Sequence, residues 1–271
     1  MKAKTLGLAT ALVVGLGLAP AAFAADLEVK APPLVAPPSW TGIYIGVNGG
    51  YGWSNGTVTE SPFQSFPGPA VVPQAFLGQN VDGAVFGVHA GYNWQWSSIV
   101  LGAEGDFDAA SMANSSQVVL PDPIGGGGGT ANDLFMAHQN VTYLASIRGR
   151  LGYALGPNLA YVTGGAAWES LRTNVGLATD TDAGTFSEAG TASLNNTVRS
   201  GWVVGTGYEW MITPNWLIRA EYLHYAFSGG NSLAVTVPCG FGGPGATCGG
   251  NVSSTTNNID VVRLGVSFKT W

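Results

Sequence analysis

The chain has 271 residues, of which 41 are glycine, 11% are aromatic and only 10% are charged. A soluble domain carries about 25% charged residues, so this composition does not indicate an ordinary water-exposed surface. Beyond the N-terminus no run of about 18 or more apolar residues occurs, which excludes a protein that crosses a membrane with helices. The sequence has no basic cluster, which excludes a nucleic acid as partner.

The N-terminus has the pattern of a secretory signal peptide over residues 1–24. Lys2 and Lys4 precede the apolar run LGLATALVVGLGLAP, and the motif AFA at 22–24 is a small-x-small cleavage site. The alternative, a single membrane anchor, is less favoured because the apolar run is short and contains Gly and Pro. Cleavage after Ala24 removes two of the 10 basic residues and none of the 16 acidic ones, which leaves a formal charge of −8.

The rest of the chain divides into a leader and one domain. Residues 25–39 are rich in proline and are predicted to be an extended leader. Residues 40–271 are predicted to form β-strands, because no helical period competes with their alternating pattern. The predicted strands are 41–53, 82–97, 98–111, 139–155, 159–174, 197–212, 216–230 and 257–271.

The connections between these strands alternate in length. Three are short turns, at 97–98, 156–158 and 213–215. The others are long and rich in Gly, Ser, Thr, Asn and Pro, at 54–81, 112–138, 175–196 and 231–256. Short turns at one end and long loops at the other predict an up-and-down antiparallel sheet whose two ends meet different surroundings.

Each predicted strand places large apolar side chains on one face and small or polar ones on the other. In the first strand Ile43, Ile45 and Val47 alternate with Gly46 and Asn48. In a soluble sandwich the bulky face fills the interior and the charges lie in water. Here the polar face is mostly glycine and small residues, which suits the crowded interior of a narrow closed sheet. The bulky face is therefore predicted to contact lipid, since every segment reaches the roughly 9–11 residues that cross a bilayer.

The charged residues on the inward face are predicted to neutralise one another. If the turn at 213–215 centres on Pro214, Glu209 and Arg219 lie directly opposite each other, which predicts an ion pair. The other inward charges are expected to form a mixed network at mid-height, which we interpret as a structural plug in preference to a conducting or catalytic group. They are Glu104, Asp106, Arg148, Arg150, Glu221 and Arg263.

All nine tryptophans are predicted to lie at strand ends. The set at the short-turn end is Trp40, Trp94, Trp96, Trp210, Trp216 and Trp271, and the set at the long-loop end is Trp53, Trp168 and Trp202. Two aromatic girdles are typical of a lipid-embedded barrel, because an indole buries its body and keeps its N–H near water. Tryptophans of an ordinary core would show no such banding. The strand at 159–174 has little contrast between its faces. Trp168 is therefore predicted to point outward only because that position completes the aromatic girdle.

The sequence predicts no catalytic, cofactor-binding or metal site, and the protein is expected not to be an enzyme. His89, His138 and His224 are far apart and have no Ser or acid partner at a readable spacing. Cys239 and Cys248 enclose a glycine-rich loop and are predicted to form a disulfide in an exported chain, since two thiols alone make a poor metal site.

The predicted long loops carry scattered acidic residues. Divalent cations bridging these acids to lipopolysaccharide phosphates are one interpretation, but solvation of the loops is favoured because the acids are not clustered as ligands. The acids are Glu60, Asp82, Asp122, Asp133, Asp180, Asp182 and Glu188.

Five short motifs resemble one known family. They are SWTGIY at 39–44, YVTGGA at 161–166, GWVVG at 201–205, RAEY at 219–222 and VRLGV at 262–266. Together they resemble the small eight-stranded immunogenic or porin-like outer-membrane barrels of Gram-negative bacteria, which are related in shape to the barrel of outer membrane protein A. One departure is Trp271, because family members usually end in an aromatic residue on the lipid face and this residue has the opposite parity.

The resemblance implies an eight-stranded antiparallel transmembrane β-barrel in the cell outer membrane, with short periplasmic turns, long extracellular loops and a periplasmic leader. It implies partners in outer-membrane lipid and lipopolysaccharide, and in the periplasmic chaperones and the barrel-assembly machinery during biogenesis. The expected function is structural and envelope-facing, with an antigen-like exposed surface and a plugged lumen. The alternatives are a narrow channel for ions or small solutes, and a receptor or adhesin that acts through the loops.

Overall fold

The computed structural model of the protein describes residues 38–60, 64–65, 76–121, 132–180, 186–228, 231–238 and 247–270. The predicted signal peptide and most of the predicted leader lie outside these residues, so both remain predictions.

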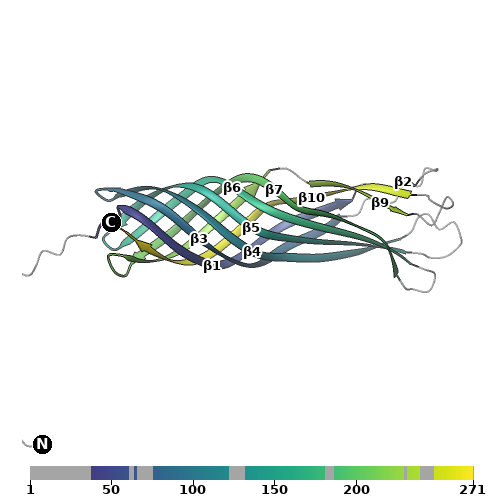
Figure 1. The fold of residues 1–271 in the computed structure, drawn as a ribbon, viewed down its shortest axis with the longest axis horizontal. Helices are drawn as coiled ribbons and strands as arrows, with labels where there is room; N and C mark the ends of the chain where they lie inside the picture. The colour runs from purple at the N-terminus through teal and green to yellow at the C-terminus, as the bar shows by residue number, and fades with distance from the viewer. Residues whose placement is uncertain are drawn as a thin grey trace, which may run out of the picture. The chain divides into compact units, whose positions relative to one another are not determined.

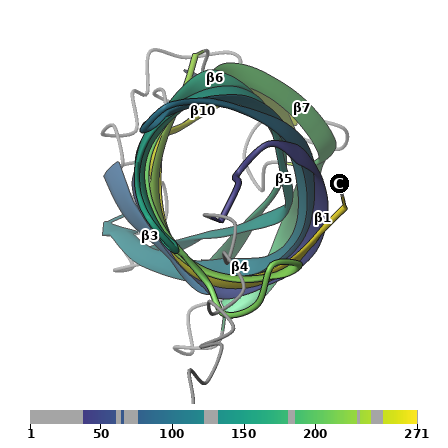
Figure 2. The same ribbon diagram turned by 90° about the vertical axis from the view of Figure 1, so that its left-hand side faces the viewer.

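Eight antiparallel strands in the described part of the chain form the wall of a closed barrel (Figures 1 and 2). Each strand pairs with the ring strand that follows it in sequence, and β1 pairs with β10 to close the ring. The ring strands are β1 Gly42–Glu60, β3 Phe76–Trp96, β4 Ile99–Pro121, β5 Asn132–Leu155, β6 Asn158–Asp180, β7 Phe186–Met211, β8 Trp216–Phe227 and β10 Thr247–Lys269. Two short strands, β2 (Gln64–Ser65) and β9 (Asn231–Pro238), pair with the first part of β10. The predicted all-β, up-and-down antiparallel fold is confirmed.

The three short turns lie where the sequence predicts them, at one end of the barrel. The turn between β3 and β4 places Ser97 in the left-handed region, with φ 55°. The turn between β5 and β6 uses Gly156, with φ 60°, where glycine has no steric cost. The third turn occupies 212–215, between β7 and β8.

The prediction of four long loops is largely wrong, because strands occupy much of each predicted loop. β1 continues to Glu60, and β4 continues to Pro121 before β5 begins at Asn132. The extended strands form the right-hand part of the barrel in Figure 1. Their outward residues are polar, such as Ser115 and Gln117, which made the segments look like loops. A strand needs only one apolar face, and here that face points inward, as Phe135 does.

Near the short turns the barrel has the opposite arrangement, with its bulky apolar side chains outside. Val88 is 54% exposed and Leu264 is 63% exposed, whereas Arg148 and Glu104 on the inward face are 1% and 4% exposed. The prediction that this part of the sheet faces lipid with its bulky side is therefore confirmed in its geometry. The glycines suit the inward face because the interior is crowded. A Cβ added at Gly91, for example, would stand 2.4 Å from the Tyr44 hydroxyl oxygen.

The two arrangements meet at β-bulges. The pairing of β4 with β5, of β5 with β6 and of β6 with β7 shifts register at neighbouring points. On β5 the shift moves the inward face from even positions, such as Leu144 and Arg148, to odd positions, such as Val141 and Gln139. A bulge adds one residue to a strand and so changes which side chains point inward.

Candidate functional site

The inward charged residues form one cluster across the middle of the barrel, which we call the ionic layer. Period-two alternation places successive charges of one strand on the same face, as in Glu104 and Asp106 of β4. The layer comprises Glu104, Asp106 and Asp108 of β4, Arg148 and Arg150 of β5, Glu209 of β7, Arg219 and Glu221 of β8, and Arg263 of β10. All of them are buried.

Arg148 connects two walls of the barrel. Its Nη2 lies 2.5 Å from Glu104 Oε1 and 2.8 Å from Asp106 Oδ1, both on the neighbouring strand β4. Its Nη1 lies 2.9 Å from Glu221 Oε1 on β8, which does not pair with β5. The side chain therefore crosses the interior, and both of its terminal nitrogens bind carboxylates.

The side chain of Arg263, on β10, also spans the interior and reaches β4. Its Nη1 lies 2.6 Å from Asp108 Oδ2, and its Nη2 lies 2.7 Å from Asp106 Oδ1. Its Nε donates to Glu221 Oε2 at 2.8 Å. Asp106 and Glu221 are thus shared between Arg148 and Arg263, which makes the layer one connected network.

The predicted pair of Glu209 and Arg219 is present but secondary. The two residues oppose each other in the hairpin, with Arg219 Nη1 3.7 Å from Glu209 Oε1. Each has a closer partner: Arg219 Nη1 lies 2.6 Å from Glu104 Oε2, and Arg150 Nη2 lies 2.8 Å from Glu209 Oε1. The hairpin register was readable from the sequence, whereas the cross-barrel partners were not.

Two tyrosines that the sequence analysis missed belong to the same network. Tyr44 donates its hydroxyl to Glu104 Oε2 at 2.8 Å and accepts a hydrogen bond from Arg150 Nη1 at 3.0 Å. The Arg150 guanidinium also lies 3.8 Å from the centre of the Tyr161 ring, in a cation–π contact. Their inward parity was the only signal available, because Tyr44 alternates with Ile43 and Ile45.

The ionic layer is enclosed by apolar side chains on both sides. On β8 the inward order is Leu217, then Arg219 and Glu221, then Leu223 and Tyr225. The cluster at the short-turn end, the mouth cluster, is Trp40, Val100, Ala154, Leu159, Tyr161, Met211 and Leu217. The cluster on the other side, the far cluster, is Val81, Val85, Met112, Val141, Leu144, Ala167, Leu171, Val203, Leu223, Tyr225, Phe227, Ile259 and Val261.

Trp40 lies inside the barrel and not in the predicted aromatic girdle. It is 0% exposed, its indole Nε1 donates to the Gly156 carbonyl at 3.2 Å, and its backbone N–H donates to Gln95 Oε1 at 2.7 Å. Figure 2 shows the purple start of the described chain turning into the ring. Trp40 precedes β1, which begins at Gly42 with φ 141°, so the chain turns into the barrel before the strand starts and the girdle prediction for Trp40 is wrong.

The other described tryptophans point outward. Trp94, Trp96, Trp210 and Trp216 are exposed at the short-turn end. Trp53 and Trp202 are exposed further along the barrel, and Trp168 is half-buried on the outward face of β6. Trp271 and Cys239 lie outside the described residues, so the terminal girdle position and the disulfide with Cys248 remain predictions.

Each histidine has a cross-strand partner that the sequence analysis did not find. His89 Nε2 lies 2.7 Å from Ser267 Oγ inside the barrel. On the outer surface His138 Nδ1 lies 2.8 Å from Ser115 Oγ, and His224 Nδ1 lies 2.7 Å from Asp260 Oδ1. These partners are distant in sequence, so no local spacing could reveal them. A second buried ion pair, Glu169 with Arg199 at 3.1 Å, was missed for the same reason.

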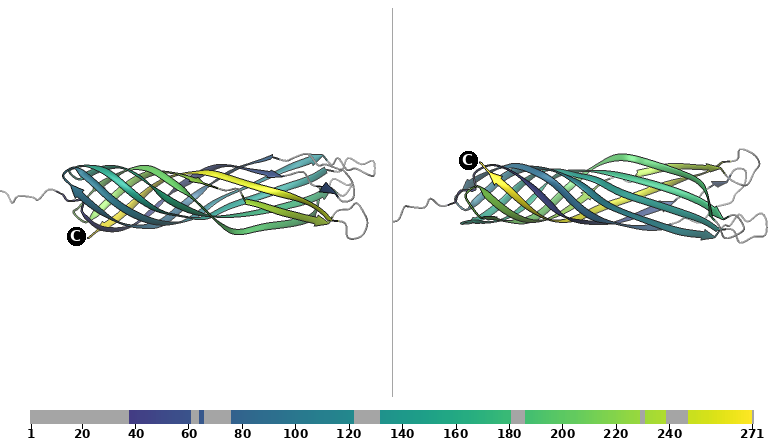
Figure 3. Two further views of the ribbon diagram at one scale, coloured as in Figure 1. Left: turned by 90° about the horizontal axis from the view of Figure 1, so that it is seen from above. Right: turned by 60° about the horizontal axis from the view of Figure 1, so that its bottom comes forward.

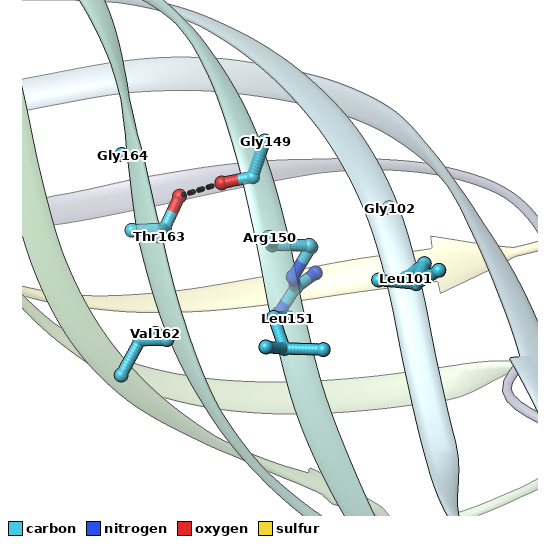
Figure 4. A pocket seen from close by; sticks show the side chains of 8 residues that line it. All are labelled: Leu101, Gly102, Gly149, Arg150, Leu151, Val162, Thr163 and Gly164. Atoms are coloured by element: carbon cyan, nitrogen blue, oxygen red, sulfur yellow. Dashed lines mark hydrogen bonds between the residues drawn. The ribbon is translucent and has the colours of Figure 1, made fainter.

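The outer wall carries a shallow hollow over β4, β5 and β6 (Figure 4). It forms because Gly149 and Gly164 are paired on the outward face and have no side chains to fill the surface. Leu101, Leu151 and Val162 make its apolar wall. Arg150 lines it from the inward side, where its guanidinium is bound to Glu209, so the hollow does not lead into the interior.

These features define a class of protein. An apolar outer belt, outward tryptophans, a charged interior and a closed sheet without edges are the arrangement that lipid requires, since every backbone polar group must find a partner within the wall. Within the described ranges no helix could span a membrane. The protein is an integral membrane β-barrel of the outer-membrane type.

The chain belongs to the family of outer membrane proteins with a β-barrel domain, whose model matches residues 9–268. It is 35% identical over 259 residues to the 31 kDa outer-membrane immunogenic protein of Brucella melitensis, covering 93% of this chain and 94% of the relative. It is 30% identical over 257 residues to the 25 kDa outer-membrane immunogenic protein of Brucella canis, covering 92% and 90%.

Similar solved structures include the outer membrane protein OprG of Pseudomonas aeruginosa, with 12% identity, a TM-score of 0.41 and coverage of 85% of this chain and 97% of that one. Neisserial surface protein A is also similar, with 13% identity, a TM-score of 0.36 and coverage of 85% and 98%. The predicted location in the outer membrane is confirmed by the family and by the names of these relatives.

Proposed function

We propose that the protein is a closed structural barrel of the outer membrane that supports the cell envelope and does not conduct solutes. The observation that supports this is the order of layers along the interior. The mouth cluster, the ionic layer and the far cluster follow one another between the two ends of the wall. An eight-stranded barrel has an interior just wide enough for its own side chains.

The ionic layer acts as the plug. Its guanidinium groups bind carboxylates on neighbouring and on opposite strands, so ions entering the barrel would have to break several buried pairs. Removing one partner of a buried pair costs about 3–5 kcal/mol, because a charge is left uncompensated. The same layer weighs against the narrow channel that the sequence left open as an alternative.

Single-channel recording tests this role. The refolded wild-type protein in a planar lipid bilayer is expected to show no steady conductance. The double variant R148A/R263A removes both arginine side chains that span the interior and is expected to conduct small ions. A matched control, I147A/V262A, changes the outward neighbours of these arginines and is expected to stay silent. Steady current through the wild-type protein would refute the plug.

We also propose that the end of the barrel opposite the short turns faces the cell exterior and is accessible there. In outer-membrane barrels short turns are periplasmic and longer connections are extracellular. The word immunogenic in the names of the Brucella relatives supports exposure at the surface. A cysteine introduced at Gln117, which is exposed at that end of β4, should react with an impermeant maleimide on intact cells, while one at Ser98 should react only after the outer membrane is permeabilised. The reverse pattern would overturn the orientation.

We infer no enzymatic activity. The Ser267 and His89 pair resembles part of a catalytic set, but both residues are 1% exposed inside the barrel, where no substrate reaches them. The expected partners, namely lipopolysaccharide, the periplasmic chaperones and the barrel-assembly machinery, remain predictions, as does a receptor or adhesin role for the loops.

A further inference from the structure

Four neighbouring strands carry an unusual row of side chains on their outward face. His224 of β8 opposes Asp260 of β10, Asp260 opposes Trp53 of β1, and Trp53 opposes Asp82 of β3. We call these four residues the surface strip. Figure 3 shows its strands side by side, with β10 in yellow, β1 in purple and β3 in blue.

The strip lies at the edge of the lipid-facing belt. On β10 the outward residues are Phe268, Val266, Leu264 and Val262, and the next one is Asp260. On β1 the apolar outward face runs from Ile43 to Trp53, which is the length of strand, about 9–11 residues, that crosses a bilayer.

This edge is the one away from the short turns. With the short turns in the periplasm, the strip lies among the headgroups of the outer leaflet. This step rests on the orientation given under the proposed function.

The two carboxylates of the strip are held in place by hydrogen bonds from neighbouring outward side chains. Tyr222 donates its hydroxyl to Asp260 Oδ1 at 2.6 Å, and His224 Nδ1 lies 2.7 Å from the same oxygen. Tyr51 donates its hydroxyl to Asp82 Oδ2. Both tyrosines belong to the row beneath the strip. These bonds use Oδ1 of Asp260 and Oδ2 of Asp82, so the other oxygen of each aspartate accepts none of them and can face a ligand.

Trp53 lies between these carboxylates and is 38% exposed. A carboxylate accepts strong hydrogen bonds from ammonium groups and also accepts from hydroxyls. An exposed indole attracts an ammonium group to its face and packs its apolar body against a ring. The combination fits a cationic sugar, and it disfavours a bare phosphate, which two carboxylates would repel.

The strip is confined to one side of the barrel. On β4, β5 and β6 no outward carboxylate occurs among the residues whose side chains are described, and the row of the strip continues from Asp82 to Ala113 of β4 and Asn140 of β5. Polarity on the other side is supplied by uncharged or basic side chains such as Asn140 and Arg172, so it is the carboxylates that are confined to one side. This one-sided negative charge indicates a particular partner.

A divalent cation is a poorer occupant of the strip. Calcium takes about 6–8 oxygen ligands, whereas the strip offers two carboxylates, one of which already accepts from Tyr222 and His224. Among the described residues no group of three or more His, Cys, Asp or Glu side chains is arranged to hold a metal ion.

We propose that the surface strip binds the ammonium- and hydroxyl-bearing sugar headgroup of a glycolipid in the outer leaflet. Asp82 and Asp260 accept hydrogen bonds from the headgroup, Trp53 packs against its ring, and Tyr51 and Tyr222 position the carboxylates.

Native mass spectrometry of the full chain in phosphatidylcholine nanodiscs tests the proposal. The probes are lipid A that carries an aminoarabinose substituent and the same lipid A without it, with EDTA present in every sample. The wild-type protein is expected to retain the aminoarabinose form at least about tenfold more than the unsubstituted form, the ratio that corresponds to one strong interaction. D82N/D260N is expected to lose this preference, and W53F to reduce it.

The matched control is W168F, which changes a tryptophan on the opposite side and is expected to keep the wild-type preference. The single variants D82N and D260N retain an acceptor for the tyrosines and provide a measurement if the double variant does not fold. Equal retention of the two lipids by the wild-type protein would overturn the proposal, as would an unchanged preference in D82N/D260N. Binding that appears only when EDTA is replaced by Mg²⁺ would overturn it in favour of a cation bridge.

The proposed function is tested separately. A barrel that conducts ions yet prefers the aminoarabinose lipid refutes the plug and supports the glycolipid site. A barrel that does not conduct and shows no lipid preference supports the plug and refutes the glycolipid site.

Discussion

Arg148 and Glu221 bind each other across the interior of the barrel, with Nη1 of the arginine 2.9 Å from Oε1 of the glutamate, although their strands, β5 and β8, are not neighbours in the sheet. This contact ties two distant parts of the wall together. Because Glu221 also binds Arg263, its carboxylate is shared by two guanidinium groups. The stability of the barrel therefore depends on groups that are far apart in sequence.

Replacing Glu221 with Gln should destabilise the barrel strongly. The change leaves Arg148 and Arg263 with one carboxylate fewer, and breaking a buried ion pair costs about 3–5 kcal/mol. The measurement is the free energy of unfolding in urea, with the protein in lipid vesicles. V262A, beside Arg263 on the lipid face, is the control and should lose less than half as much. Equal losses in the two variants would contradict a structural role for the ionic layer.

Replacing Trp40 with Ala should also destabilise the barrel, by about 3–5 kcal/mol, because a large buried side chain leaves a cavity in the mouth cluster. W94A makes the same chemical change on the outward surface, where Trp94 is 61% exposed, and should cost less. Unfolding in urea measures both. A larger loss for W94A would indicate that Trp40 does not seal the mouth.

Adjacent glycines of β6 should respond differently to alanine. A Cβ at Gly165 would lie 2.0 Å from the Ile147 carbonyl oxygen on the inward side, whereas the nearest atom to a Cβ at Gly164 is 3.5 Å away on the outward side. G165A should cost about 1–3 kcal/mol through overpacking, and G164A should be close to neutral. Comparable losses would mean that the interior is less crowded than the structure shows.

The closed barrel should migrate in a heat-modifiable way on SDS gels. Unboiled protein keeps its ring of backbone hydrogen bonds and should run as a compact form, and boiling should shift it to the position of the unfolded chain. A spin label at Val88, which is 54% exposed on the outward face, should be relaxed strongly by lipid-soluble oxygen. Identical mobility before and after boiling would count against closure.

The facing of most strands could be predicted from the sequence because it is a local property. A strand alternates its side chains with a period of two, so Val88 and Gly87 must point to opposite sides wherever the strand lies. Trp40 lies before the start of β1, so this rule does not reach it, and its position inside the barrel depends on the turn of the chain at Gly42.

The extent of the strands could not be predicted from polarity alone. Ser115 and Gln117 look like loop residues when read as a run, yet they lie on the outward face of β4, where Val118 pairs with the buried Phe135 of β5. The arrangement reverses along one strand, from apolar outside to apolar inside, at the β-bulges, as expected where a barrel passes from lipid into water.

By itself the sequence determined the class of protein, the eight ring strands, their three short turns and the inward position of the charges, because composition and alternation depend only on neighbouring residues. Only the tertiary structure decided which charges meet, where Trp40 lies and that His224, Asp260, Trp53 and Asp82 form one row. These relationships depend on the tilt of the strands and the closure of β1 on β10. Closure brings residues about 200 positions apart within hydrogen-bonding distance, as for Ser54 and Asn258.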